Sequence, residues 1–164
     1  MKIHTVILAA GEGSRMLSNK AKSLQPVGGL SMLRRIFDTV SNLTDETSFV
    51  VGFEKDSVTK EIEKFSGINH ICEQKKPIGT ADAVKSALDS IKQDSKVLVL
   101  YGDVPLIKKE TLNNLISMTD DSLTILSTEL KDPTGYGRVK KNENGLAISI
   151  VEEKDASEED KKIK

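Results

Sequence analysis

The residues of this chain best suited to phosphate chemistry lie in one short loop near its start. An apolar run from Val6 to Ala10 ends at Gly11 and Gly13, and the cations Arg15 and Lys22 follow closely. Glycine lets backbone N–H groups approach a ligand and accepts positive φ angles that other residues resist. Together with the two cations, such a loop can surround a polyphosphate at the end of a buried strand. The coincidence favours phosphate binding over a tight turn with two solvated basic residues.

Two well-known phosphate loops do not fit this segment. A dinucleotide-binding loop would need a third glycine at the helix start and an acidic residue ending the second strand, which Thr47–Gly52 lacks. A Walker loop would need Gly-Lys followed by Ser or Thr, and that triplet is missing from the loop. We therefore expect a phosphate loop of another kind.

A second cluster runs from Gln74 to Ala81, after a predicted strand and at the start of a predicted helix. The Gln74 amide can donate and accept hydrogen bonds at once, which suits the edge of a pyrimidine base. Gly79 allows close approach of a ligand, and Thr80 offers a hydroxyl at the expected helix cap. A capped helix start after a proline-restricted loop explains the same residues equally well.

A third cluster, Tyr101-Gly102-Asp103, directly follows a predicted strand. A carboxylate at the carboxyl end of a central strand is well placed to hold Mg²⁺ against phosphate oxygens. The alternative is an Asp that accepts hydrogen bonds within a turn. We favour the metal role because the phosphate loop is expected at the same edge.

A fourth cluster combines the glycine loop 135–137 with the carboxylates that follow Val151. Backbone N–H groups and a facing carboxylate could bind a sugar. A glycine-rich turn and a charged strand end are the commoner explanation of these residues.

These clusters require a scaffold of alternating strands and helices, which the apolar pattern predicts. The expected strands are Lys2–Ala9, Thr47–Gly52, Asn69–Glu73, Lys96–Tyr101 and Ser122–Glu129. Helical faces begin at Leu33, Val58, Ala81 and Leu112, the third of them continuing to Ile91. Strands between two helical layers should pair in parallel and bind ligands at their carboxyl ends, near a switch in strand order. After Lys131, two strands (138–141 and 146–153) joined by Asn142–Gly145 predict a hairpin.

Composition narrows the function classes. With 164 residues the chain can form one domain with a core, and 24 basic against 25 acidic residues argue against a general nucleic-acid binder. No apolar stretch reaches membrane-spanning length and no signal peptide is recognisable, so we expect a cytoplasmic protein. The single Cys72 fits a reducing compartment as a buried, inert thiol, and His4 and His70 are expected to be structural or solvent-facing.

In this order, the four clusters closely resemble the pyrophosphorylase domain of bacterial bifunctional N-acetylglucosamine-1-phosphate uridylyltransferases. The matching segments are Leu8–Met16, Lys22 with Pro26-Val27, Gln74 with Pro77 and Gly79–Ala81, Tyr101–Ile107, Asp132–Val139 and Ile150–Ala156. The resemblance implies an α/β, Rossmann-like nucleotide-diphospho-sugar transferase fold with a mainly parallel sheet flanked by helices. It also implies that residues 1–164 form a single, C-terminally incomplete nucleotidyltransferase domain, without the family's acetyltransferase β-helix.

The resemblance also assigns roles and a reaction. A sugar phosphate oxygen would attack the α-phosphorus of UTP, releasing pyrophosphate and forming UDP-N-acetylglucosamine with help from Mg²⁺. By position, the nucleotide would be bound by Ala10, Gly11, Gly13, Gln74, Gly79 and Thr80, the phosphates by Arg15 and Lys22, Mg²⁺ by Asp103, and the amino sugar by Gly137 and Glu152.

Some features depart from the family pattern. Glu12 stands where the family often has Lys, and Gln25 replaces a frequent His. By the resemblance, the chain is expected to end before a sugar-binding Asn and before a second Asn that belongs to the magnesium site. Water or a partner chain would have to take the place of that missing metal ligand. The alternatives are therefore a non-catalytic nucleotide-binding remnant or an enzyme for another sugar phosphate or nucleotide. An uncovered edge should also cause self-association through residues 122–153.

Overall fold

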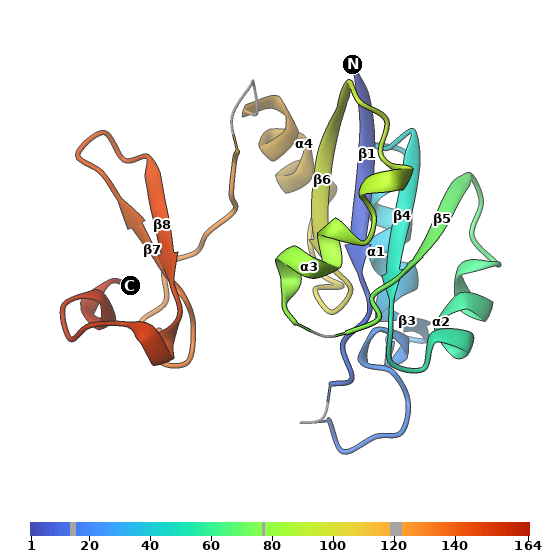
Figure 1. Cartoon of the computed structure of the whole chain (residues 1–164), viewed down its shortest axis with the longest axis horizontal. Coiled ribbons are helices and arrows are strands. Elements are labelled where there is room, and N and C mark those ends of the chain that lie inside the picture. Colours follow the sequence, from blue (N-terminus) through green and yellow to red (C-terminus); the bar gives the residue numbers. More distant parts are fainter. Residues whose placement is uncertain (14–15, 77, 119–122) are drawn as a thin grey trace. The chain divides into compact units, whose positions relative to one another are not determined.

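A computed structural model of the chain describes residues 1–13, 16–76, 78–118 and 123–164 (Figure 1). The chain forms two compact units, Met1–Ile116 and Ser117–Lys164. Each unit has its own sheet, and each is described by itself. Among the described residues, no helix has the length and apolar character needed to cross a membrane.

The first unit is built on a four-stranded sheet in the order β5-β4-β1-β6 (Figure 1). Its strands are β1 (Lys2–Leu8), β4 (Glu46–Val51), β5 (Ile68–Glu73) and β6 (Ser95–Tyr101). All neighbouring strands pair in parallel. The chain adds β4 and β5 on one side of β1 and then returns to place β6 on the other side. The predicted parallel α/β sheet is confirmed, and its strand order switches between β1 and β6.

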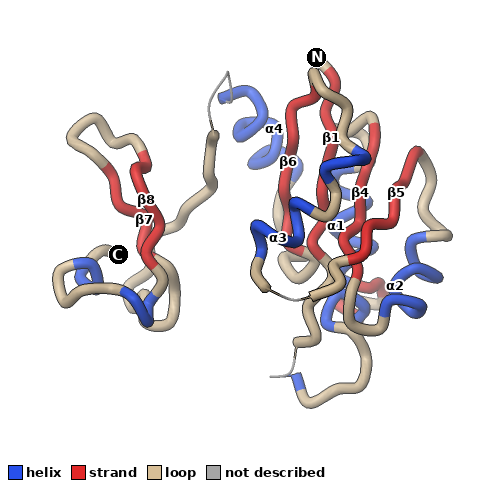
Figure 2. The backbone as a smooth tube through the Cα atoms, in the orientation of Figure 1, coloured by secondary structure: helices blue, strands red, loops and turns tan. Residues whose placement is uncertain are grey.

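Helices cover both faces of this sheet (Figure 2). Successive strand residues point to opposite faces, so Ile7 packs with α1 (Met32–Val40), α2 (Lys55–Ile62) and α4 (Lys109–Met118). Its neighbour Val6 packs on the other face against Ala83 of α3 (Thr80–Lys85) and against Ala87. Both residues are fully buried, which explains why the second half of β1 is apolar on both faces rather than alternating.

The described residues between β1 and α1 form short elements. They are the 3₁₀ turn η2 (Lys22–Leu24) and the antiparallel pair β2 (Pro26–Val27) and β3 (Leu30–Ser31). The hydroxyl of Ser31 then caps α1 by accepting a hydrogen bond from the Arg34 N–H at 3.1 Å. This path brings Lys22 back beside the end of the sheet.

The third predicted helix differs from expectation at both ends. It stops at Lys85, and a separate 3₁₀ turn, η3 (Leu88–Ser90), follows. The Ser86 hydroxyl donates to the Asp82 carbonyl at 3.0 Å, and such serine side chains compete with helical hydrogen bonds. At the other end Gly79, not Thr80, is the cap residue, and no side chain caps the helix.

The second unit contains the predicted hairpin. Strands β7 (Arg138–Lys141) and β8 (Ala147–Val151) pair antiparallel, followed by the 3₁₀ turns η4 (Glu153–Asp155) and η5 (Asp160–Lys162). The expected strand Ser122–Glu129 is wrong, because residues 123–130 have no strand structure (Figure 2). Its apolar pattern suits a strand, but within the described ranges no strand lies beside it to supply hydrogen bonds.

Candidate functional site

A pocket opens at the carboxyl ends of β1 and β6, where the strand order switches. It has a volume of about 240 Å³. Ligands of open α/β sheets bind at this place because the loops leaving the two strands diverge there. The lining residues are Leu8, Ala9, Ala10, Gly11, Lys22, Ser23, Gln74, Gly79, Thr80, Ala83, Tyr101, Gly102 and Asp103.

Most of the residues predicted from the first three clusters meet in this pocket. They are Ala10, Gly11, Lys22, Gln74, Gly79, Thr80 and Asp103. The predicted Arg15 lies outside the described residues. Three elements far apart in sequence thus bring a glycine loop, an amide and an ion pair to one edge of the sheet.

Gly13 does not line the pocket but supports a residue that does. Its φ is +68°, and a Cβ atom added there would lie only 2.6 Å from the Cβ of Lys22. Any other residue would therefore be strained and would push Lys22 aside. Gly13 was expected to contact the nucleotide, and in the structure its lack of a side chain leaves the space that Lys22 occupies.

Two glycines outside the predicted set allow the strand ends to approach each other. An added Cβ at Gly102 would lie 2.7 Å from the Leu8 carbonyl, and one at Gly52 would lie 3.0 Å from the Ala10 carbonyl. The Gly102 N–H donates to the Leu8 carbonyl at 2.8 Å. Gly102 directly follows the predicted strand Lys96–Tyr101, whereas Gly52 was predicted as the last residue of a strand and follows β4 in the structure.

Lys22 and Asp103 form an ion pair at the pocket wall. The Lys22 Nζ lies 2.6 Å from Asp103 Oδ2, and both side chains remain about a third exposed. The pair places a cation and a carboxylate, the groups expected for phosphate and metal, within contact of each other. A ligand entering the pocket meets both charges together.

The Gln74 side chain is held by two acceptors at the start of α3. Its Nε2 donates to the Gly79 carbonyl at 3.0 Å and to Asp82 Oδ2 at 3.0 Å. Asp82 was not singled out from the sequence, although it directly follows the Gln74–Ala81 cluster. The amide is thereby fixed in one orientation.

The predicted sugar-binding residues lie in the second unit, around the loop that leads into β7. An added Cβ at Gly137 would lie 3.8 Å from the Glu152 Cδ, so these two predicted residues are neighbours. The carboxylate that faces the glycine loop most directly is that of Glu153, which accepts from the Gly135 N–H at 3.2 Å. Glu153 also pairs with the buried Arg138 guanidinium at 2.8 Å.

The sequence of this chain matches a known protein family. Residues 5–138 match the model of the MobA-like NTP transferase domain, and the match spans both the pocket and the start of β7. The chain belongs to this family. Its parallel sheet flanked by helices is that of an NTP transferase domain.

A curated relative matches this NTP transferase domain over nearly its whole length. The bifunctional protein GlmU of Marinobacter nauticus is 43% identical over 163 residues, which cover 98% of this chain and 36% of that protein. The resemblance to bacterial bifunctional uridylyltransferases is confirmed. The chain spans little more than a third of the length of this relative.

Solved structures support the fold of the NTP transferase domain. HddC from Yersinia pseudotuberculosis, complexed with GMP-PN, superposes with a TM-score of 0.71 at 22% identity, covering 91% of this chain and 68% of that one. Rv0371C from Mycobacterium tuberculosis, in complex with manganese, gives a TM-score of 0.56 at 19% identity, with coverages of 71% and 58%. At these identities the likeness concerns the fold.

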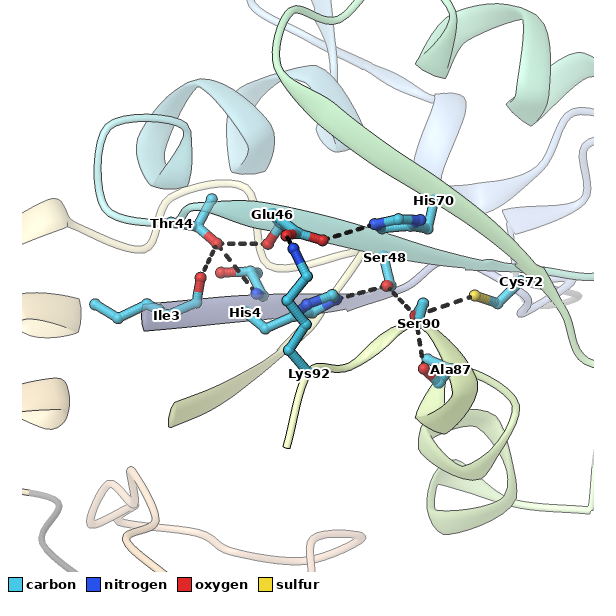
Figure 3. A network of polar contacts seen from close by, with 11 residues as sticks. Ile3, His4, Thr44, Glu46, Ser48, His70, Cys72, Ala87, Ser90 and Lys92 are labelled. Atoms are coloured by element: carbon cyan, nitrogen blue, oxygen red, sulfur yellow. Dashed lines mark hydrogen bonds and ion pairs between the residues drawn. The ribbon is translucent and has the colours of Figure 1, made fainter. Parts of the chain in front are cut away.

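The NTP transferase domain carries a second polar network, at the amino ends of the strands (Figure 3). The buried Glu46 of β4 binds His70 of β5 at 3.0 Å and also pairs with Lys92. The buried His4 of β1 stacks on His70 and bonds the Ser48 hydroxyl at 2.7 Å. The network therefore ties three strands together, and both histidines have structural contacts as expected.

This network extends through Ser90 of η3 to Cys72. The Ser48 and Ser90 hydroxyls lie 2.6 Å apart, and the Cys72 sulfur lies 3.8 Å from the Ser90 hydroxyl (Figure 3). Cys72 is half-buried rather than fully buried. Across the described ranges, no group of three His, Cys, Asp or Glu side chains is arranged to hold a metal ion, so the network does not form a metal site.

Proposed function

We propose that this chain is a sugar-1-phosphate nucleotidyltransferase that converts UTP and N-acetylglucosamine-1-phosphate into UDP-N-acetylglucosamine and pyrophosphate. The observation that carries the proposal is the switch-point pocket, where the glycine loop, Gln74 and the Lys22–Asp103 pair meet. The shared sequence with the bifunctional protein GlmU supports the choice of substrates. A GMP-PN complex of HddC supports a nucleotide as the ligand of this fold.

The proposed chemistry needs alignment and charge neutralisation rather than a protein nucleophile. An oxygen of the sugar phosphate attacks the α-phosphorus of UTP, and the bond from that phosphorus to the bridging oxygen of the β-phosphate breaks. Pyrophosphate leaves with the electron pair of that bond. Lys22 stabilises the negative charge that develops on the phosphates, and the family resemblance gives Arg15 the same role. Gln74, Gly79 and Thr80 surround the base and ribose, and Gly137 with Glu152 contacts the amino sugar.

The pocket residues fit a magnesium ion held mainly by substrate. Asp103 supplies one carboxylate, and Mg²⁺ is commonly bound by one or two carboxylates together with substrate phosphates. When bound there, the ion would neutralise phosphate charge. The Lys22 ammonium, 2.6 Å from Asp103, would be freed from this pair to contact the phosphates. A manganese complex of Rv0371C supports a divalent metal for this fold.

We propose that residues 1–164 act as one nucleotidyltransferase domain although they form two compact units, because the family match crosses the boundary between them. We also propose that copies of the chain associate through residues 122–153. No role for nucleic acid is proposed, since the net charge of −1 offers no general attraction to it.

The test is the release of pyrophosphate from UTP. Release should require N-acetylglucosamine-1-phosphate and a divalent metal together, and other sugar phosphates should replace the substrate poorly. Lys22→Met should lower kcat/KM by about 100-fold, because it removes a fixed charge aimed at the phosphates. The control Lys60→Met removes an exposed lysine of α2 and should change kcat/KM by less than about twofold.

The outcomes separate the possible functions. Saturable UTP binding without any release of pyrophosphate would show that the chain is a nucleotide-binding module and not an enzyme. Release with a different sugar phosphate would keep the enzyme class and change the substrate. Absence of both binding and release from a folded sample would contradict the proposal.

A further inference from the structure

We propose that Asp82 determines which side of the Gln74 amide meets the nucleobase, and so makes the pocket select uracil over cytosine. The inference rests on the proposed function, in which Gln74 faces the base. Asp82 itself is half-buried on α3 and does not line the pocket. It is therefore a positioning residue that acts through Gln74.

The position of Gln74 is fixed by its backbone. Its N–H donates to the Val51 carbonyl at 2.9 Å, which continues the β4–β5 hydrogen bonding beyond the end of β5. The side chain is then anchored by Nε2, which donates to Gly79 O and to Asp82 Oδ2, each at 3.0 Å. Both protons of the amide nitrogen are used within the protein.

Both partners of Nε2 are oxygen acceptors, so the orientation of the amide has a physical cause. Rotating the amide by half a turn would place Oε1 against a carbonyl oxygen and a carboxylate oxygen. That rotation would lose two hydrogen bonds and create two repulsive contacts. The atom that Gln74 has left for a ligand is therefore the acceptor Oε1.

Of the two acceptors, Asp82 contributes more to this preference. The Gly79 carbonyl already accepts the Ala83 N–H at 3.1 Å, as part of the first turn of α3. A carboxylate forms the stronger hydrogen bond because it carries a charge. Removing that charge should free the amide to turn.

The chemistry of the bases converts this orientation into selectivity. Uracil carries a hydrogen on ring nitrogen N3 and can donate it to Oε1, whereas N3 of cytosine is an acceptor. An acceptor that meets another acceptor in the pocket loses its hydrogen bond and is repelled. The pocket should thus bind UTP more tightly than CTP for as long as Asp82 holds the amide.

The test compares UTP with CTP by calorimetric titration of the full chain. Asp82→Asn keeps the shape of the side chain but can donate as well as accept, so Gln74 can turn its Nε2 toward the base. We expect the ratio of UTP to CTP affinity to fall by about tenfold in this variant. Asp82→Glu keeps a carboxylate and should retain most of the ratio. Asp89→Asn, the same change at an exposed residue of η3, should keep the wild-type ratio.

The outcomes distinguish this inference from the proposed function. If the wild-type chain binds neither nucleotide, the proposed function fails and the inference fails with it. In another outcome, the wild type prefers UTP while Asp82→Asn keeps the ratio of UTP to CTP affinity, or lowers both affinities equally. Either result overturns only the inference. The ratio is independent of the fraction of folded protein, so partial unfolding does not obscure it.

A measurement on the wild type covers the case in which Asp82→Asn does not fold. The side-chain NH₂ resonances of Gln74 are assigned by their loss in Gln74→Ala. Slow exchange of both protons with water is the expected result, since both are hydrogen-bonded. Rapid exchange of either proton would overturn the inference.

Discussion

At the scale of single residues, the pocket depends on neighbouring residues that determine where a pocket side chain lies. Gly13 has no Cβ and so leaves room for Lys22, and Asp82 accepts a hydrogen bond from Gln74. In both cases the supporting residue does not line the pocket. Substitutions at such positions should therefore affect ligand binding without removing a group that touches the ligand.

Gly13→Ala tests this support at Lys22. The positive φ strains any residue with a Cβ, and the new methyl group would lie 2.6 Å from the Cβ of Lys22. Gly29→Ala is a matched control, because φ is +85° there and an added Cβ meets nothing within 4 Å. Both variants should lose about 1 kcal/mol of unfolding free energy from backbone strain. Only Gly13→Ala should also weaken UTP binding, and equal UTP affinity in the two variants would refute the role of Gly13.

At the scale of elements, an ion pair between a buried guanidinium and a half-buried carboxylate holds the glycine loop of the second unit against η4. The Arg138 guanidinium is 3% exposed, pairs with Glu153 and donates to the Tyr136 carbonyl. Arg138→Met should leave the Glu153 carboxylate without its cation, costing about 2 kcal/mol or more of local stability. Hydrogen exchange of the β7 and β8 amides measures this loss.

A second ion pair of the same unit provides the control. Lys161 and Glu158 pair at 2.8 Å on the surface, where solvent screens the charges, so Lys161→Met should hardly change the exchange of the hairpin amides. If the two variants accelerate exchange of the hairpin amides equally, Arg138 has no special role in holding the loop.

The polar network across β1, β4 and β5 should make stability depend on pH. Burial lowers the pKa of His4 below its ordinary value of 6.5, with His70 and Lys92 acting in the same direction and Glu46 opposing. The unfolded state then binds more protons, so the free energy of unfolding should fall as the pH drops below 6.5.

Hydrogen bonds from Lys92 and His70 lower the pKa of Glu46 to about 2. The stability from Glu46 is complete above its ordinary pKa of 4.5 and is lost as the pH falls toward 2.

Urea unfolding at a series of pH values tests the role of His4. The wild type should lose stability between about pH 7 and pH 5, and His4→Gln, which does not titrate, should lose less over the same interval. An unchanged pH slope in His4→Gln would show that the acid sensitivity arises elsewhere.

At the scale of the whole molecule, the second unit exposes several large apolar side chains, and clustered exposed apolar residues favour association. Its exposed large apolar residues include Leu123, Leu126, Leu146, Ile148 and Ile150, each at least 58% exposed. We expect the sedimentation coefficient to rise with protein concentration, and Ile148→Lys to reduce this rise. The control Leu88→Lys places the same charge on an exposed apolar residue of the first unit. A strictly monomeric wild type at high concentration would contradict self-association.

The sequence predicted the parts of this molecule that local patterns encode. The second half of β1 is apolar on both faces, and glycines or polar residues mark where the strands end, so the sheet and the edge that carries the pocket could be predicted. The strand expected at 122–129 did not form, because pairing depends on a neighbour that no local pattern reveals. A carboxylate after Val151 was expected to face the glycine loop, and Glu153 is the one that accepts a hydrogen bond from it. The contact of Asp82 with Gln74 depends on side-chain geometry and was missed for the same reason as the absent strand pairing.

The central claim is that the pocket between the ends of β1 and β6 binds a uridine nucleotide. Titration of the isotope-labelled chain with UTP, followed by the backbone amide resonances, tests it most directly. We expect saturable shifts concentrated at Gly11, Lys22, Gln74, Gly79 and Asp103. Resonances that stay unchanged in the folded protein at millimolar UTP, or saturable shifts confined to other residues, would contradict the claim.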